Sequence, residues 1–191
     1  YAELDAIFNI ETPEKTAVCI LADKEETGSD GPSGMQSDLI LDLINEISVS
    51  LGGNPAVVRA NSKCLSADVS SVYDPNFAEV FEKRNSAMLG CGAVFTKFTG
   101  ARGKSSTNDA SAEYIGWLRM LLSKENVIWQ SGELGKVDCG GGGTVAKYIS
   151  KHNIDTVDLG VPVISMHAPY EVIAKVDLYE TYRAAKAFYL Y

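Results

Sequence analysis

Two adjacent carboxylates, Glu25 and Glu26, are the residues whose types and spacing point most clearly to chemistry. They follow an apolar run at residues 16–22 and precede a turn that is punctuated by glycines. Neighbouring strand residues point to opposite faces, but where a chain begins to turn, both side chains can reach one cleft. One carboxylate can then hold a metal ion while the other moves a proton. A metal-dependent hydrolase needs this division of labour.

Each candidate also has a plainer interpretation. Glu25 and Glu26 could be solvated loop charges, as most carboxylates are, although glycine spacing after the pair favours backbone packed closely around a site. Asp68 follows a short strand-like segment, where it could be a metal ligand or a turn cap. His167 lies in an apolar segment next to a proline, where it could be a ligand or a hydrogen-bonded structural residue.

A run of four glycines at residues 140–143, followed by Thr144, is the most distinctive composition in the chain. Glycines before a helix let backbone N–H groups approach a ligand closely. A phosphate site is one interpretation, but neither the P-loop spacing nor the dinucleotide spacing is met. We favour a substrate-binding wall or a set of oxyanion-type donors, formed by Gly142, Gly143 and Thr144.

Strands alternate with helices, which indicates an α/β fold with a mostly parallel sheet. Apolar runs predict strands at residues 16–22, 63–67, 93–98, 127–130 and 156–159. Apolar residues at helical spacing predict helices at residues 1–8, 35–51, 109–123, 144–152 and 169–191. Ligands gather at the carboxyl ends of strands in such folds, so the acidic and imidazole side chains named above are expected to converge.

Composition and charge exclude several classes of function. The 191 residues are 46% hydrophobic and 22% charged, which is typical of a globular protein. The net charge of -8 argues against a nucleic-acid partner, because phosphate binding needs clustered basic residues. The sequence contains neither a run suited to a membrane span nor a visible signal peptide. Four cysteines without CxxC spacing are interpreted as reduced thiols of a cytoplasmic protein.

Five segments carry a resemblance to a known family. In chain order they are DKEETGSDGPSGMQS, SADVSSVYDPN, KFTGARGKSSTNDA, GKVDCGGGGTVA and DLGVPVISMHAPYE. They resemble the successive motifs of the aspartyl aminopeptidase family of zinc metallo-aminopeptidases, above all its bacterial branch. The resemblance spans nearly the whole chain and keeps the motif order. It implies a three-layer α/β sandwich of the zinc-exopeptidase kind, with a mostly parallel central sheet.

The resemblance also implies roles for individual residues. Glu25 matches the general base, which takes a proton from the attacking water and passes it to the leaving amine. Glu26 and His167 match two ligands of one metal ion, and Asp68 matches a ligand of a second. The implied cofactor is a pair of zinc ions, with cobalt or manganese as alternatives.

Departures from the family pattern predict an incomplete site. An upstream His that ligates the second metal and an upstream bridging Asp have no counterpart here, and neither has the family's dimerisation domain. Residues 1–191 are therefore expected to be a single partial catalytic domain, inactive by itself. The resemblance implies that the parent protein is a homo-oligomer, a tetrahedral dodecamer.

Peptides with an acidic or neutral N-terminal residue are the expected substrates. An acidic side chain would need a cation in the pocket. Lys97, Arg102 and Lys104 are the candidates, although a basic loop can equally be a solvated one.

Three competing functions remain open. A related glutamyl/leucyl-type metallo-aminopeptidase would share the general fold. A non-enzymatic assembly or scaffold paralogue would explain the missing ligands. A nucleotide-binding protein would explain only the glycine run.

Overall fold

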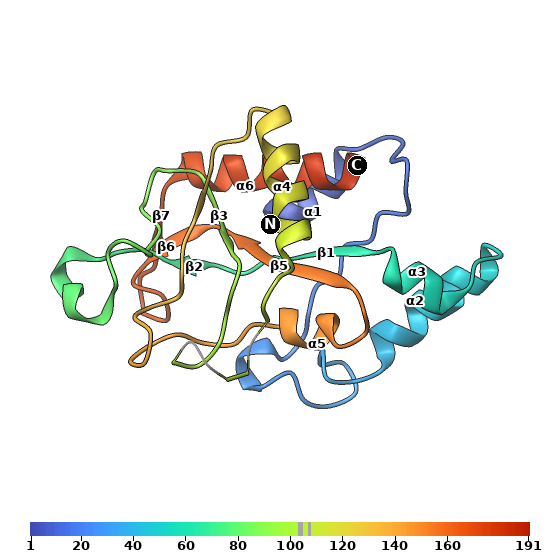
Figure 1. The fold of residues 1–191 in the computed structure, drawn as a ribbon, viewed down its shortest axis with the longest axis horizontal. Helices are drawn as coiled ribbons and strands as arrows, with labels where there is room; N and C mark the ends of the chain where they lie inside the picture. Colours follow the sequence, from blue (N-terminus) through green and yellow to red (C-terminus); the bar gives the residue numbers. More distant parts are fainter. Residues whose placement is uncertain (103–104, 107) are drawn as a thin grey trace.

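The computed structural model describes residues 1–102, 105–106 and 108–191, and Figure 1 shows their arrangement. The helices are α1 (Ala2–Phe8), η1 (Glu25–Thr27), α2 (Leu39–Ser50), α3 (Pro55–Ala60), η2 (Pro75–Val80), α4 (Ala112–Lys124), α5 (Ala146–Ser150) and α6 (Lys175–Leu190). The strands are β1 (Lys63–Ser66), β2 (Ser70–Ser71), β3 (Ala93–Thr96), β4 (Trp129–Ser131), β5 (Asp155–Gly160), β6 (Pro162–Ile164) and β7 (Val172–Ile173).

The strands form two sheets. Two stretches of chain run from one sheet into the other, because β2 follows β1 and β6 follows β5. The larger sheet has the order β1-β5-β3-β4, and the smaller has the order β2-β6-β7. Within them β1 and β5, β3 and β4, and β2 and β6 pair in parallel, whereas β3–β5 and β6–β7 are antiparallel. The predicted α/β fold with a mostly parallel sheet is therefore confirmed.

Helices cover both faces of the larger sheet. On one face α4 and α6 lie side by side, and their Tyr114, Leu118, Leu122 and Ala184 form a core with β3 and β5 (Figure 1). On the other face α5 packs against β1 and β5, and its Ile149 joins a smaller core. Helix, sheet and helix make the three layers that the resemblance implied. None of the described helices is long and apolar enough to cross a membrane.

Local sequence explains where several elements begin. The Ser111 hydroxyl accepts a hydrogen bond from the Tyr114 backbone N–H and caps α4. Asn54 caps α3 in the same way, and proline occupies the first helical position. The strand predicted at residues 63–67 and the helix predicted at residues 109–123 are both found within a few residues of their expected bounds.

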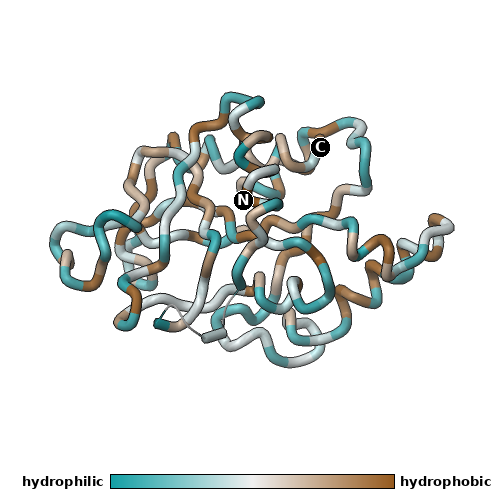
Figure 2. Tube along the Cα trace, in the orientation of Figure 1, coloured by the Kyte–Doolittle hydropathy of each residue, from teal (hydrophilic) through white to brown (hydrophobic). Residues whose placement is uncertain are grey.

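The strand predicted at residues 16–22 is wrong. This segment has no strand assignment and is largely exposed, with Leu21 exposed to 73%. A strand needs a neighbour to satisfy its backbone groups, and no other described strand pairs with it. The α2–α3 end of the molecule likewise carries exposed hydrophobic residues, which are brown in Figure 2.

The helix predicted at residues 169–191 begins later than expected. Val172 and Ile173 pair with β6, so α6 starts only at Lys175. Glu171, expected at the helix start, instead accepts a hydrogen bond from the backbone N–H of His167. Pairing with β6 therefore overrides the local start signal.

Two buried carboxylates anchor α6 to the sheet. Asp177 accepts hydrogen bonds from the backbone N–H groups of Gly90 and Gly92, at 2.7 Å each. Glu180 accepts from the N–H of Ile128 and forms an ion pair with Arg183. Buried charges are tolerated only when they are paired or hydrogen-bonded in this way.

Candidate metal centre

The Glu25–Glu26 pair lies in a tight helical turn, η1, and not at the end of a paired strand. Lys24 before the pair and Gly28 after it both adopt left-handed backbone, with φ of 61° and 94°. A left-handed backbone conformation is uncommon for lysine, and backbone strain of this kind clusters at functional sites. The loop folds tightly on itself, because a Cβ on Gly34 would lie 2.1 Å from the Ser29 carbonyl oxygen.

Asp68 lies where the chain passes from the larger sheet into the smaller one. Ser66 pairs with Asp158 and Ser70 pairs with Pro162, so the two parallel ladders keep the same register across the break. This register brings Gly160 against Asp68, and a Cβ on Gly160 would lie only 1.3 Å from the Asp68 carbonyl oxygen. Only glycine can occupy that position without moving the backbone of Asp68.

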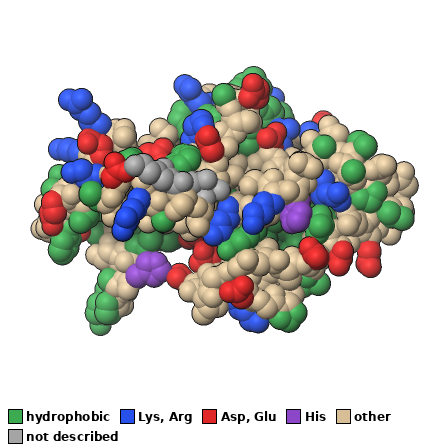
Figure 3. All heavy atoms as spheres, turned by 60° about the horizontal axis from the view of Figure 1, so that its bottom comes forward, with side chains coloured by type: hydrophobic (Ala, Val, Ile, Leu, Met, Phe, Trp, Pro, Cys, Tyr) green, Lys and Arg blue, Asp and Glu red, His purple; other side chains and the backbone are tan. Residues whose placement is uncertain are grey.

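His167 approaches the Glu26 side of the η1 turn. Its Nδ1 lies 3.8 Å from the Glu26 carboxylate, and both side chains are mostly exposed, to 68% and 75%. The residue is left-handed, with φ of 65°, and its N–H donates to the Glu171 carboxylate at 2.6 Å. Figure 3 shows a hollow on this face, with one histidine and one acidic side chain meeting at its rim.

Two acidic residues of this region, Glu25 and Asp68, have raised pKa values. Burial raises the pKa of Glu25, and the negative charges of Asp68 and Glu26 raise it further, while His167 and Lys147 act in the opposite direction. Burial also raises the pKa of Asp68, against a lowering effect of the hydrogen bond from the Val69 N–H. These couplings place Glu25, Glu26, Asp68 and His167 within electrostatic reach of each other.

The donor types suit zinc, but the donor count in this chain is short. Carboxylate oxygen and imidazole nitrogen are the usual ligands of catalytic zinc. Among these donors, the Nδ1 of His167 lies 3.8 Å from the Glu26 carboxylate. However, no group of three His, Cys, Asp or Glu side chains within the described residues is placed to hold an ion.

The glycine run is fixed against the loop that carries Arg102. Gly100 donates its N–H to the Gly142 carbonyl at 2.8 Å, and Asp138 donates its N–H to the Arg102 carbonyl. A Cβ on Gly141 would lie 2.5 Å from the Gly100 carbonyl oxygen. The run is thus a packed wall, and the helix it opens, α5, begins at Ala146.

Thr144 faces a buried carboxyl that sequence reasoning missed. Asp158 is 6% exposed, and its carboxylate oxygens and the hydroxyls of Ser66 and Thr144 have no hydrogen-bond partner among the described residues. The hydroxyls of Thr144 and Ser66 lower the Asp158 pKa, although neither makes a hydrogen bond to the carboxylate in this structure. Burial outweighs them and raises that pKa to about 6. A buried polar cluster without partners marks a place where water or an ion belongs.

The basic candidates are placed unequally. Lys97 forms an ion pair with Asp109, so its charge is already engaged. Arg102 is exposed and lies on the loop against the glycine run. Lys104 lies outside the described residues. Lys147, which was not a candidate, is the lysine whose charge reaches Glu25.

The sequence contains a usable signal for only one of the three residues that sequence reasoning missed. Asp158 lies between the apolar residues Val157 and Leu159, a pattern that could have marked it as a buried polar residue. Gly160 follows the same strand, but its contact with Asp68 depends on strand pairing that the sequence does not display. Lys147 is an ordinary helical lysine, and only the packing of α5 near η1 brings its charge toward Glu25.

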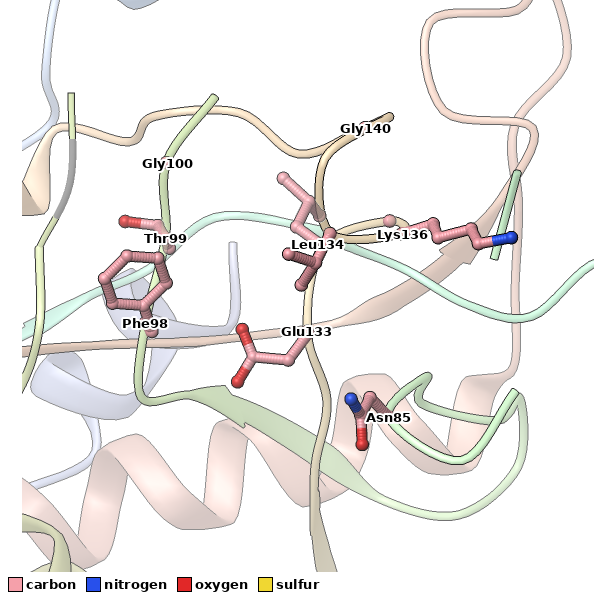
Figure 4. Close-up of a pocket in the computed structure, with 10 residues that line it drawn as sticks. Asn85, Phe98, Thr99, Gly100, Glu133, Leu134, Lys136 and Gly140 are labelled. Carbon is pink, nitrogen blue, oxygen red and sulfur yellow. The ribbon is translucent and has the colours of Figure 1, made fainter. Parts of the chain in front are cut away.

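A separate cavity of about 300 Å³ opens beside the glycine run (Figure 4). Its lining residues are Asn85, Phe98, Thr99, Gly100, Glu133, Leu134, Gly135, Lys136, Val137 and Gly140. None of the four residues proposed for the chemistry lines it.

A layered α/β fold with carboxylates and an imidazole near the ends of its strands is the architecture of many metal-dependent hydrolases. Comparison with known proteins narrows this class. Residues 1–189 match the family described as aminopeptidase I zinc metalloprotease (M18). The chain belongs to the M18 family.

Relatives and solved structures agree with this assignment. The probable M18 family aminopeptidase 1 of Clostridium acetobutylicum is 48% identical over 193 residues, which cover 98% of this chain and 41% of that protein. The Clostridium acetobutylicum aminopeptidase I crystal structure, also 48% identical, matches with a TM-score of 0.91 over 99% of this chain and 41% of that one. The Thermotoga maritima M18 aminopeptidase structure is 40% identical. It matches with a TM-score of 0.93 over 98% of this chain and 42% of that one. The chain thus spans about two fifths of these relatives.

The contact between Gly160 and Asp68 yields a test by substitution. Gly160→Ala should lower the free energy of unfolding by more than about 2 kcal/mol, because the added methyl group cannot fit without displacing the Asp68 backbone. Urea unfolding followed by circular dichroism measures the change. The control is Gly116→Ala on the exposed face of α4, where a Cβ meets nothing. It should stabilise by about 0.5–1 kcal/mol, through helix propensity. Equal effects of the two substitutions would contradict this account.

Asp158 should make stability depend on pH. Because its folded pKa is raised from 3.8 to about 6, the folded state holds a proton that the unfolded state has lost in this range. The free energy of unfolding should therefore fall as pH rises from about 4 to about 6, by about 3 kcal/mol from this group. Asp158→Asn should remove that slope. Urea unfolding of both proteins across this range in EDTA measures it, and parallel pH profiles would show that Asp158 does not titrate this way.

Proposed function

We propose that this chain supplies part of the catalytic domain of a zinc-dependent aminopeptidase that removes N-terminal residues from peptides. The observation that carries the proposal is the approach of His167 to Glu26, next to Glu25, on a chain that matches the M18 family over residues 1–189. Strained backbone at Lys24 and His167 supports the same conclusion, because strain is retained where geometry serves function.

Glu25 is the proposed general base. It would take a proton from the attacking water and deliver it to the leaving amine. Its raised pKa moves it toward the range where a carboxylate exchanges protons efficiently near neutral pH. Bound zinc would polarise the scissile carbonyl and lower the pKa of water. The glycine run, with Thr144 behind it, would form the wall along which the peptide lies.

Glu26, His167 and Asp68 are the proposed zinc ligands within this chain. Glu26 and His167 would hold one ion and Asp68 the other. The set is completed, in this proposal, by a histidine and a bridging aspartate from the part of the protein that the curated relatives have in addition. The chain alone is then a weak metal binder without turnover.

Substrates and assembly follow the family in this proposal. Peptides with acidic or neutral N-terminal residues would be cleaved in the cytoplasm. Yeast aminopeptidase 1, 23% identical in the compared structure, forms a dodecamer, and we propose a homo-oligomer for the complete protein.

Metal content and aminopeptidase activity, measured together, test the function. The complete gene product and residues 1–191 would be compared on Asp-, Glu- and Leu-terminal peptides with added zinc or cobalt. We expect metal and turnover in the complete product, and little of either in the chain alone. Neither metal nor activity in the complete product would favour the non-enzymatic scaffold instead.

Two variants of the complete product separate the base from a ligand. Glu25→Gln should lower turnover at least about 1,000-fold while zinc content stays near normal, because it removes a proton acceptor and no ligand. His167→Ala should lose zinc as well as activity. Zinc analysis with peptide hydrolysis measures both. Equal loss of zinc in the two variants would show that Glu25 is not simply the base.

A further inference from the structure

The cavity beside the glycine run contains a carboxylate that makes no hydrogen bond or ion pair with the described residues. Glu133 lines it, and its side chain has no hydrogen bond or ion pair within the described part of the chain. Figure 4 shows its carboxylate directed into the space near Phe98. Its backbone is held firmly, because the Glu133 N–H donates to the Asn85 carbonyl at 2.6 Å. Burial raises the pKa of this carboxyl, with opposing contributions from Lys97 and Asp109.

Among the described residues, the charges around the cavity do not cancel that of Glu133. Lys97 is the nearby cation, but it is paired with Asp109. Lys136 also lines the cavity, yet Figure 4 shows its side chain extending away from Glu133. One negative charge is therefore left over, and a partly buried carboxylate of this kind is stabilised by a cation.

The remaining walls define the shape of the cation. Phe98, Leu134 and Val137 supply apolar surface, and the cavity of about 300 Å³ has room for one extended side chain. An apolar lining with one carboxylate suits an ammonium or guanidinium carried on an aliphatic stem.

The position of the cavity indicates which residue of a peptide reaches it. Gly140 forms part of the cavity wall, and the glycine run continues from there to Thr144. Thr144 lies beside Asp158, and so does Ser66, which ends the strand β1 shortly before Asp68. Because neither Glu25 nor the proposed ligands line the cavity, it is offset from the chemistry. In the proposed placement of the peptide along the glycine run, the first residue lies at the metal centre, and we assign the cavity to the second residue.

We propose that this cavity binds a lysine or arginine side chain at the second position of the peptide substrate, with Glu133 as the residue that selects it. The inference rests on the proposed aminopeptidase function and adds a specificity that the family assignment does not supply.

The test compares peptides that differ only in one ammonium group. The complete gene product would be assayed with Ala-Lys-Ala and Ala-norleucine-Ala, and with Lys-Ala-Ala and norleucine-Ala-Ala. We expect kcat/KM to favour lysine over norleucine by about tenfold or more at the second position only, through a charge-assisted hydrogen bond. Equal rates at the second position, or a preference confined to the first, would overturn the proposal.

Variants assign the preference to Glu133. Glu133→Gln should abolish the lysine preference while changing kcat/KM for Ala-norleucine-Ala less than about threefold, and Glu133→Lys should favour Ala-Glu-Ala. Glu113→Gln, on the exposed face of α4, is the matched control and should keep the preference. A lysine preference that survives both Glu133 variants would exclude this residue.

Cleavage of the norleucine peptides separates this inference from the proposed function. If no peptide is hydrolysed, the aminopeptidase proposal itself fails. If norleucine and lysine peptides are hydrolysed equally, only the cation site is refuted.

Discussion

The close approach of Gly160 to the carbonyl of Asp68 is the constraint on which the arrangement of the candidate centre depends. Two parallel strand pairs, β1–β5 and β2–β6, keep one register across a break in the chain. At the break the two backbones come so close that no Cβ fits on Gly160. This contact fixes the position of Asp68, which follows the end of β1. The strand after Gly160, β6, leads on to His167. One backbone contact therefore sets the positions of two of the proposed ligands.

Repulsion between buried acidic side chains is the second feature of this end of the sheet. Burial raises the pKa of Glu25, Asp68 and Asp158, and the carboxylates raise one another further. Like charges brought together out of water are costly unless a cation joins them. Within the described residues, Lys147 and His167 supply only part of the opposing charge at Glu25. The collection of acidic groups therefore suits the proposed zinc ions, and the family assignment gives the same interpretation independently.

Elements with complete local signals could be predicted from the sequence. The α4 helix has its cap at Ser111 and its apolar stripe within one stretch, and the strand predicted at residues 156–159 lies within β5. The failures share a cause. Residues 16–22 have the composition of a strand but no described neighbour to pair with, and α6 starts late because residues before it pair with β6. Pairing partners lie far away in the chain, so local composition cannot reveal them.

The sequence by itself determined the layered α/β class, most of the helices, and the residue types suited to a metal and a base. Those follow from periodicity and from side-chain chemistry, which are local properties. Only the tertiary structure decided that Lys97 is paired with Asp109 and that the charge of Lys147 reaches Glu25. It also decided that Asp158 is buried, and that Glu133 lines a cavity, without hydrogen-bond partners for either carboxylate among the described residues. Burial and long-range contact control the charge and availability of a side chain, and both arise only when distant segments pack together.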